Sequence, residues 1–250
     1  LIDMTPEGPD DMVGKGFTAG YGPAEIVYAG WYSGVYTTTE GTILIDDETA
    51  AQCLVPFPAG TFDGEIVVCD RGQIARVAKA ENVAAGGAGG FVLVNVAPNF
   101  LAGDAFIVPG VHLAVEDGIA LKSWMTNTVV QSATIQGYTM SITDTNADQI
   151  NTSSSRGPNY VGSILKPDVT APGTDILAAV ATNHESPAPN PEFDFYSGTS
   201  MASPHVAGVG LLIRALHPDW TPAEIQSALT STADNSQTTT DGVESTPFEA

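Results

Sequence analysis

The sequence predicts an α/β protein in which a small mixed α/β domain is followed by a second region with short buried strands and a long apolar helix. Three observations predict this class. Short apolar runs alternate with turns between residues 26 and 134, one strand–helix–strand unit lies within that stretch, and a long apolar helix follows near residue 200. The 26 glycines and 17 prolines lie between the short runs rather than in one linker, as expected for packed elements joined by turns.

The strand–helix–strand unit is the clearest element of the first domain. Residues 73–85 place Ile74, Val77 and Val83 near helical spacing, and a pair of glycines then ends that helix. Residues 1–20 are rich in glycine and proline and are expected to form a loop. The strands expected in this domain cover residues 26–28, 43–45, 65–69, 91–96 and 134–137.

The second domain is predicted from two helices. The first is apolar almost all round, so it must be buried on most sides. The second begins with Thr221 at the N-cap, Pro222 at the first helical position and Glu224 three residues after the cap. The elements expected here are a polar crossover at 136–160, buried strands at 168–171 and 176–180, a Pro-rich loop at 187–191 and helices at 200–216 and 222–231.

Composition excludes two classes of partner. The chain carries 8 Lys+Arg against 29 Asp+Glu, a net charge of −21, whereas binding of nucleic-acid phosphates needs Lys and Arg. No apolar run approaches the roughly 18 residues that a membrane span needs, and no basic, then apolar, leader stands at the amino end. Since 43% of the residues are hydrophobic, the charge does not indicate disorder. We expect neither nucleic acid nor membrane as a partner.

The segment 198–208, GTSMASPHVAG, carries the chemistry. It places Ser200 where a glycine-containing turn enters a helix, and the N–H groups of a first helical turn lack partners inside the helix. This arrangement presents a nucleophile with an oxyanion donor beside it. A capped core helix would explain an isolated Gly-Thr-Ser, but not the whole segment. The residues that support the motif are Gly198, Thr199, Met201, Pro204 and His205.

This segment closely resembles the nucleophile motif of subtilisin-like serine proteases, and Ser200 matches the catalytic serine. Two further segments match in the family's order, SSSRGP at 153–158 and KPDVTAPG at 166–173, and HPDWT at 217–221 corresponds as well. The matches cover roughly residues 150–235, and the resemblance implies that this region is the C-terminal part of a subtilisin-like parallel-sheet α/β domain. The resemblance implies a secreted serine endopeptidase that hydrolyses peptide bonds of a protein or peptide substrate through an acyl-enzyme on Ser200, whose backbone N–H is one oxyanion donor.

The middle of the chain resembles the protease-associated domain that larger subtilases carry as an insertion. The matching residues are GEIVVCDRG at 64–72, Lys79, AGGAGG at 85–90 and VLVN at 92–95. The resemblance implies a small mixed α/β domain with an open-barrel-like sheet, which positions substrate or binds proteins and in some members helps to form dimers. The domains expected are a residual catalytic-domain segment at 1–20, the protease-associated domain at 21–135, and the C-terminal part of the catalytic domain at 136–250.

The family also has an Asp, a His and an oxyanion Asn motif before its insertion, and none of these appears in the sequence. The resemblance therefore implies a fragment that lacks a general base and is inactive alone. Residues 245–248 resemble the stretch before the family's last Gly-rich strand. The expected partners of the apolar helix are a second copy, the missing protease segments or a rearranged part of residues 1–20. The alternative function is a non-catalytic interaction module centred on the protease-associated domain.

None of the four histidines is predicted to replace the missing base. His205 lies five positions after Ser200, about 140° round the helix, so a structural role is expected for it. His184 lies in a Pro/Asn loop, and His112 and His217 lie near turn residues, which indicates no catalytic role.

Three other patterns are interpreted as structural. The glycines at 86–90 follow a helix and lead into a strand, the reverse of a phosphate-binding loop. Residues 144–148 resemble the start of a calcium loop, but Gln149 and Ser155 stand where Gly and Glu are required. The glycosylation sequon at Asn151 overlaps the core-entry motif. No metal site and no required cofactor are expected, although the resemblance allows structural calcium in the full-length protein.

Cys53 and Cys69 are the two cysteines of the chain. Two thiols of an intracellular protein would usually be buried hydrophobes. For an exported acidic protease, a single disulfide closing a loop of about 16 residues is the better interpretation, with Cα atoms within about 7 Å.

Overall fold

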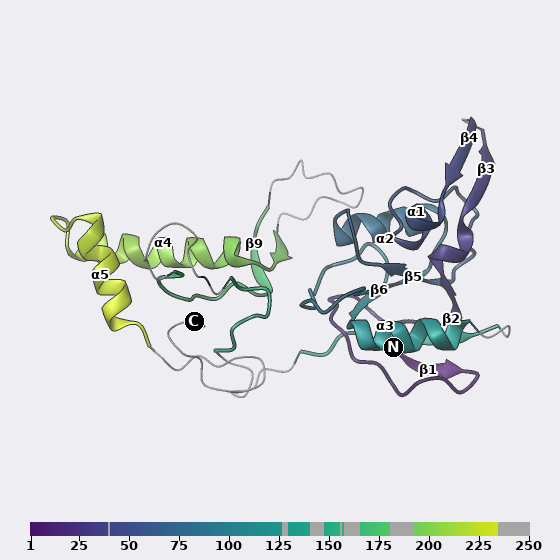
Figure 1. Ribbon diagram of the computed structural model, residues 1–250, viewed down its shortest axis with the longest axis horizontal. Helices are drawn as coiled ribbons and strands as arrows, with labels where there is room; N and C mark the ends of the chain where they lie inside the picture. The colour runs from purple at the N-terminus through teal and green to yellow at the C-terminus, as the bar shows by residue number, and fades with distance from the viewer. Residues whose placement is uncertain are drawn as a thin grey trace. The chain divides into compact units, whose positions relative to one another are not determined.

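The computed structural model describes residues 1–39, 41–126, 130–140, 148–155, 157, 166–180 and 193–234. The chain forms two compact units (Figure 1). The first contains residues 1–140 and 179–194, and the second contains residues 141–178 and 195–250. No helix of the described residues is both long and apolar enough to cross a membrane.

A six-stranded mixed sheet forms the centre of the first unit. Strands β2, β5, β6 and β7 are parallel to one another. Strand β8 lies between β1 and β2 and runs antiparallel to both. The spatial order is β1 (Ile2–Thr5), β8 (Ser132–Ile135), β2 (Tyr21–Tyr28), β5 (Ile66–Asp70), β6 (Gly90–Val94) and β7 (Gly110–Leu113).

Apolar side chains cover both faces of this sheet. Alternate residues of a strand point to opposite faces, so Ile66 and Val68 join one core cluster while Val67 and Cys69 join the other. Helix α3 (Val115–Met125) covers the first face, and α2 (Arg76–Ala85) covers the second (Figure 1). Burial on both faces explains why the strands appear as continuous apolar runs in the sequence.

The predicted strand–helix–strand unit is confirmed as β5–α2–β6, with the two strands parallel and Val67 paired with Phe91. The helix begins at Arg76 rather than at residue 73. It ends at Ala85, next to the glycines that were expected to end it. The chain is therefore an α/β protein, as the sequence predicts.

A hairpin and a short helix lie between β2 and β5. The hairpin consists of β3 (Gly34–Thr38) and β4 (Gly41–Ile45), and it follows the short helix η1 (Ala29–Tyr32). Helix α1 (Asp47–Ala51) comes next. A disulfide joins Cys53, just after α1, to Cys69 on β5, with Cα atoms 6.0 Å apart and both residues buried. The buried ammonium of Lys79 donates to the carbonyl of Gln52, beside this disulfide, and burial lowers the pKa of Lys79 to about 8.

Residues 1–20 are not the separate loop that their composition predicts. Residues 2–5 form β1, which pairs with β8, and Leu1, Met4 and Met12 are buried in the core on the α3 face. Single apolar residues among glycines and prolines show no strand periodicity. Their order comes from pairing with a strand about 130 residues away, which local sequence cannot reveal. These residues pack with the sheet formed by residues 21–135 and belong to the same compact unit.

The described residues from 166 onward contain two strands and two helices. The strands are β9 (Ile176–Ala179) and β10 (Phe193–Tyr196), which pair with each other, and the helices are α4 (Thr199–Leu216) and α5 (Pro222–Thr232). The predicted start of α5 is confirmed, because Thr221 and Glu224 form a reciprocal capping box. The predicted loop at 187–191 and the segment 245–248 lie outside the described residues.

The two buried strands expected after residue 166 are not observed as predicted. Residues 168–171 form no strand, and residues 177–179 of β9 are exposed rather than buried. Helix α4 forms where predicted and has no buried residue, as expected for an apolar helix that needs a partner outside the described residues. The apolar residues of a helix show which of its faces need to be covered, but burial also requires a neighbouring element. The described residues do not supply enough neighbouring surface to cover α4.

Candidate active site

Ser200 is the second residue of α4, and its side chain is exposed. Gly198 is the N-cap, and its φ of +156° is a conformation that other residues rarely adopt. The N–H groups of Met201 and Ala202 donate to the carbonyl of Gly198, at 2.9 and 3.4 Å. Among the described residues, the N–H groups of Thr199 and Ser200 have no acceptor, so two first-turn donors are available beside the hydroxyl.

Two of the predicted motif segments meet at the entrance to α4. The Gly198 N–H donates to the carbonyl of Gly173 at 2.7 Å. A Cβ at Gly173 would lie 2.8 Å from the Gly198 oxygen and 3.2 Å from the Cβ of Ala202. This close approach therefore requires glycine at position 173, the last residue of KPDVTAPG.

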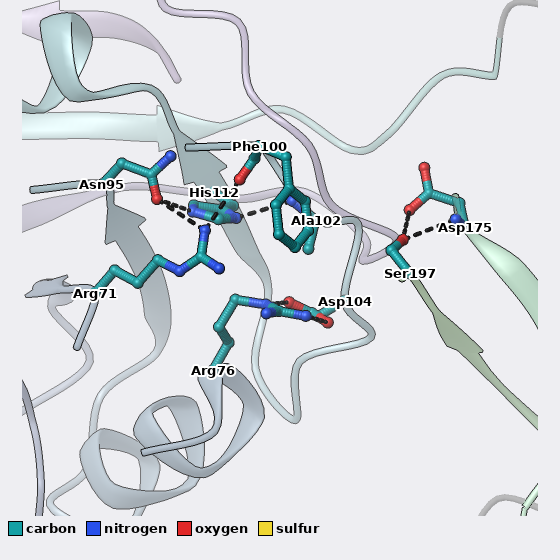
Figure 2. A network of polar contacts seen from close by, with 9 residues as sticks. All are labelled: Arg71, Arg76, Asn95, Phe100, Ala102, Asp104, His112, Asp175 and Ser197. Carbon is teal, nitrogen blue, oxygen red and sulfur yellow. Dashed lines mark hydrogen bonds and ion pairs between the residues drawn. The ribbon is translucent and has the colours of Figure 1, made fainter. Parts of the chain in front are cut away.

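A second contact joins Ser197 to Asp175, just outside these two segments. The Asp175 N–H donates to the Ser197 hydroxyl at 2.8 Å, and that hydroxyl donates to the Asp175 carboxylate at 3.0 Å (Figure 2). Asp175 has a φ of +52°. The hydroxyl thus holds a left-handed turn next to the residues that begin the nucleophile helix.

The segment KPDVTAPG also contacts α5. The Asp168 carboxylate accepts a hydrogen bond from the Gln226 amide at 3.1 Å and forms an ion pair with Lys166. The hydrogen bond from Lys166 holds the pKa of Asp168 below its usual value. One segment therefore contacts both helices that the sequence predicted.

A cavity of about 430 Å³ lies beside the start of α4. Ser200 is not in its wall, but Thr199 and Ala202 of the same helical turn are. Asn151 also lines the cavity, where its amide donates to the Thr174 hydroxyl at 3.0 Å and its oxygen accepts from Ser153. The sequon asparagine is thus engaged within the protein. The full lining is Asp148, Gln149, Ile150, Asn151, Ser153, Ser154, Thr170, Ala171, Pro172, Gly173, Thr174, Gly198, Thr199 and Ala202.

None of the three described histidines contacts Ser200. His205 donates from Nδ1 to the Met201 carbonyl at 2.8 Å, which is a structural role within its own helix. The ring of His217 stacks on Trp220 at 4.0 Å. His112 is buried in the first unit, and His184 lies outside the described residues. The described site therefore combines a hydroxyl with oxyanion donors but holds no base.

His112 has a larger role than its position near turn residues indicates. It is fully buried on β7, its Nδ1 accepts from the Ala102 N–H at 3.1 Å, and its Nε2 lies 2.9 Å from the side-chain oxygen of Asn95 (Figure 2). Since the Ala102 N–H must donate, the proton is on Nε2, which donates to Asn95. Burial, and then the charges of Arg71 and Arg76, lower the pKa of His112 to about 4.

The arginines of this network bind the connection between β6 and β7. Arg71 donates from Nη1 to the Asn95 side-chain oxygen at 3.2 Å and to the Phe100 carbonyl at 3.0 Å. Arg76 pairs with both carboxylate oxygens of Asp104, at 2.5 and 3.0 Å. Polar residues directly after β5 and β6 were a signal for this network, because the ends of parallel strands meet at one edge of a sheet.

Among the described residues, no group of three or more His, Cys, Asp or Glu side chains is placed to hold a metal ion. Residues 144–147 of the calcium-like segment lie outside the described residues.

Comparison with known proteins gives related sequences for both units. The Subtilase family matches residues 83–246, and the PA domain family matches residues 24–121. Two subtilisin-like proteases of Arabidopsis thaliana, SBT5.4 and SBT1.3, are each 40% identical over 178 residues, which is 68% of this chain and 23% of theirs. A third, SBT1.6, is 38% identical over 203 residues, which is 74% of this chain and 26% of its own.

A solved structure, the psychrophilic subtilisin-like protease Apa1 from Pseudoalteromonas sp. AS-11, is 18% identical. The match covers 87% of this chain and 35% of Apa1, but its TM-score of 0.25 is too low to support an argument about the fold. The chain spans about a quarter of the length of the curated relatives it matches. Because the Subtilase match covers residues 83–246, which is more than half of the sequence, this chain belongs to the subtilase family.

Proposed function

We propose that the protein to which this chain belongs is a serine endopeptidase and that Ser200 is its nucleophile. The observation that carries the proposal is the position of Ser200: exposed, second in α4, and beside two backbone N–H donors without acceptors among the described residues. Its relatives are named subtilisin-like proteases, which supports the same reaction class.

The reaction follows from this geometry once a base is supplied. Ser200 Oγ attacks the carbonyl carbon of the peptide bond while its proton passes to the base, and the carbonyl oxygen becomes an oxyanion. The Ser200 N–H donates to that oxyanion. Collapse of the intermediate breaks the C–N bond, the base returns the proton to the leaving amine, and an acyl-enzyme remains. Water then hydrolyses the ester. We propose that the base comes from the part of the protease outside these 250 residues.

Labelling with a fluorophosphonate tests the proposal. The full-length protein should react stoichiometrically, Ser200→Ala should abolish labelling, and Ser203→Ala, an exposed serine one turn along the same helix, should leave it intact. The 250-residue chain should not react, since serine without a base is a poor nucleophile at neutral pH. Full-length Ser200→Ala that still labels at wild-type rate would reject the assignment.

A second candidate function is protein interaction through the protease-associated part. The hairpin β3–β4 supports it, because Val35 and Leu44 are cross-strand partners that are 67% and 71% exposed. Paired apolar side chains on a two-stranded hairpin are typical of a surface that associates, and we propose a second copy of the chain as the partner. In sedimentation experiments, the double variant Val35→Thr, Leu44→Thr should be monomeric at concentrations where the wild type forms a dimer. Val13 is an exposed residue outside the hairpin, so the control variant Val13→Thr should still form the dimer. Equal association of both would reject this surface.

We also propose that the protein is exported. The disulfide between Cys53 and Cys69 supports this, since disulfides persist in oxidising compartments.

Serine protease chemistry requires no cofactor. Structural calcium in the full-length protein remains a proposal, which the melting temperature with and without a chelator tests.

A further inference from the structure

Two arginines of the first unit lie close together at the carboxyl edge of its parallel strands. Arg71 directly follows β5, and Arg76 begins α2. Both guanidinium groups lie over the ring of Phe100, at 4.9 and 5.8 Å from its centroid. In open α/β sheets this edge is where ligands bind.

Among the described residues, Arg76 binds a carboxylate and Arg71 does not. Arg76 uses Nε and Nη2, the two donors on one side of the fork, to bind Asp104 bidentately. Arg71 uses only Nη1, which donates to two neutral oxygens. Within the described residues the Nε and Nη2 groups of Arg71 have no acceptor, so the edge that binds a carboxylate is unoccupied (Figure 2).

The electrostatics of the site favour an anion. Arg71 is half-buried, and burial together with the charge of Arg76 lowers its pKa, so its cation is poorly compensated. The neighbouring His112 stays neutral for the same reason. Two other cations of the first unit pair with aspartates: Arg76 with Asp104, and Lys122 with Asp70 at 2.7 Å. A carboxylate at Arg71 would supply the second negative charge that the arginine pair lacks.

The site is also held rigid before any ligand binds. The Asn95 side chain receives Arg71 Nη1 on one side and donates to the Asn99 carbonyl on the other, at 3.0 Å. The Phe100 ring fixes the plane of the guanidinium. Little side-chain entropy is therefore left for Arg71 to lose when an anion binds.

We propose that the free Nε–Nη2 edge of Arg71, supported by Phe100 and Arg76, binds a carboxylate of a polypeptide ligand. An acidic side chain and a C-terminal carboxylate offer the same chemistry. The inference goes beyond the association proposed for the hairpin β3–β4, and it does not require Ser200 to be catalytic.

The test follows the guanidinium Nε–H signals of the whole, isotope-labelled chain by NMR during titration with blocked amino acids. Acetyl-glutamate amide presents a side-chain carboxylate, acetyl-glycine presents a C-terminal one, and acetyl-glutamine amide is the neutral control. At least one of the first two should shift the Arg71 signal saturably, and the tighter one identifies the source. Higher salt should weaken that binding. The neutral compound should have no effect.

A matched pair of variants separates binding from structure. Arg71→Lys keeps the charge and a donor for the Phe100 carbonyl but loses the bidentate edge, so affinity should fall about tenfold or more. Arg214→Lys, on α4, should bind as the wild type does. The amide signals of Phe100 and Ala102 report whether the network remains folded, and Ser200→Ala should bind normally whether or not labelling of the protease succeeds. Absence of a saturable shift at Arg71, or wild-type affinity in Arg71→Lys, would overturn the site.

Discussion

At the scale of the residue, the approach of Gly173 to Gly198 determines how the nucleophile helix begins. Replacing Gly173 by Ala places a Cβ 2.8 Å from the Gly198 oxygen, so the backbone must move, and we expect the second unit to lose about 1–3 kcal/mol of stability. Gly208→Ala is the matched control, because a Cβ there meets nothing within 4 Å and alanine favours a helix. Urea unfolding followed by a probe in residues 199–232 measures both. Equal midpoints for the two variants would contradict the role of this contact.

His112 gives the first unit a predicted pH dependence. Its pKa is about 4 in the folded protein and about 6.5 in an unfolded chain. Between these two pH values the unfolded state binds a proton at this histidine and the folded state does not, which favours unfolding. Stability from this group is complete above pH 6.5, declines as the pH falls towards 4, and then stays level. The total is about 3 kcal/mol. Urea midpoints of wild type and His112→Gln between pH 4 and 7.5 should converge as the pH falls, whereas a constant difference would reject the burial of a neutral histidine.

At the scale of the element, the sequence predicted those helices and strands whose stabilising contacts come from residues close by in the chain. The unit β5–α2–β6 and the capping box of α5 were predicted because their signals lie within about 30 residues of the chain. Strand β1 was missed because its partner is β8, about 130 residues away. The role of His112 was missed because its partners Asn95 and Ala102 lie at the end of the neighbouring strand and in the connection after it, where no periodic pattern marks a contact. The position of Ser200 in the first turn of a helix was predicted because a turn-to-helix motif is local.

The cap of α5 makes this local order measurable. Thr221→Ala removes the side-chain acceptor of the Glu224 N–H and one half of the capping box, so we expect a loss of about 0.5–2 kcal/mol, seen as faster amide exchange in the first turn of α5. Ser231→Ala, an exposed residue near the other end of the same helix, should leave that turn unchanged. If both variants exchange alike, the capping box does not stabilise the helix start.

At the scale of the whole molecule, the two units differ in how far they can bury their own apolar surface. The first covers both faces of its sheet, whereas α4 leaves Val209, Leu211, Leu212 and Leu216 between 46% and 77% exposed. Full burial of each such side chain would contribute about 1.5–3 kcal/mol, which for four is comparable with the roughly 5–15 kcal/mol stability of a domain. We therefore propose that α4 is completed by a second copy of the chain or by the remainder of the protease.

Hydrogen exchange on the 250-residue chain tests this difference between the units. In a dilute monomer, the amides of 66–94 should be strongly protected and those of 199–216 weakly protected, because a helix without buried contacts opens at little cost. Raising the concentration, or adding the remaining protease segments, should increase protection in α4 while leaving that of β5 and β6 unchanged. If the partner covers the exposed apolar face that contains Leu212, the Leu212→Gln variant should not show the increased protection of α4. The control variant Thr230→Gln, on α5, should show it as the wild type does. Equal protection of both ranges in a proven monomer would mean that α4 is already covered and needs no partner.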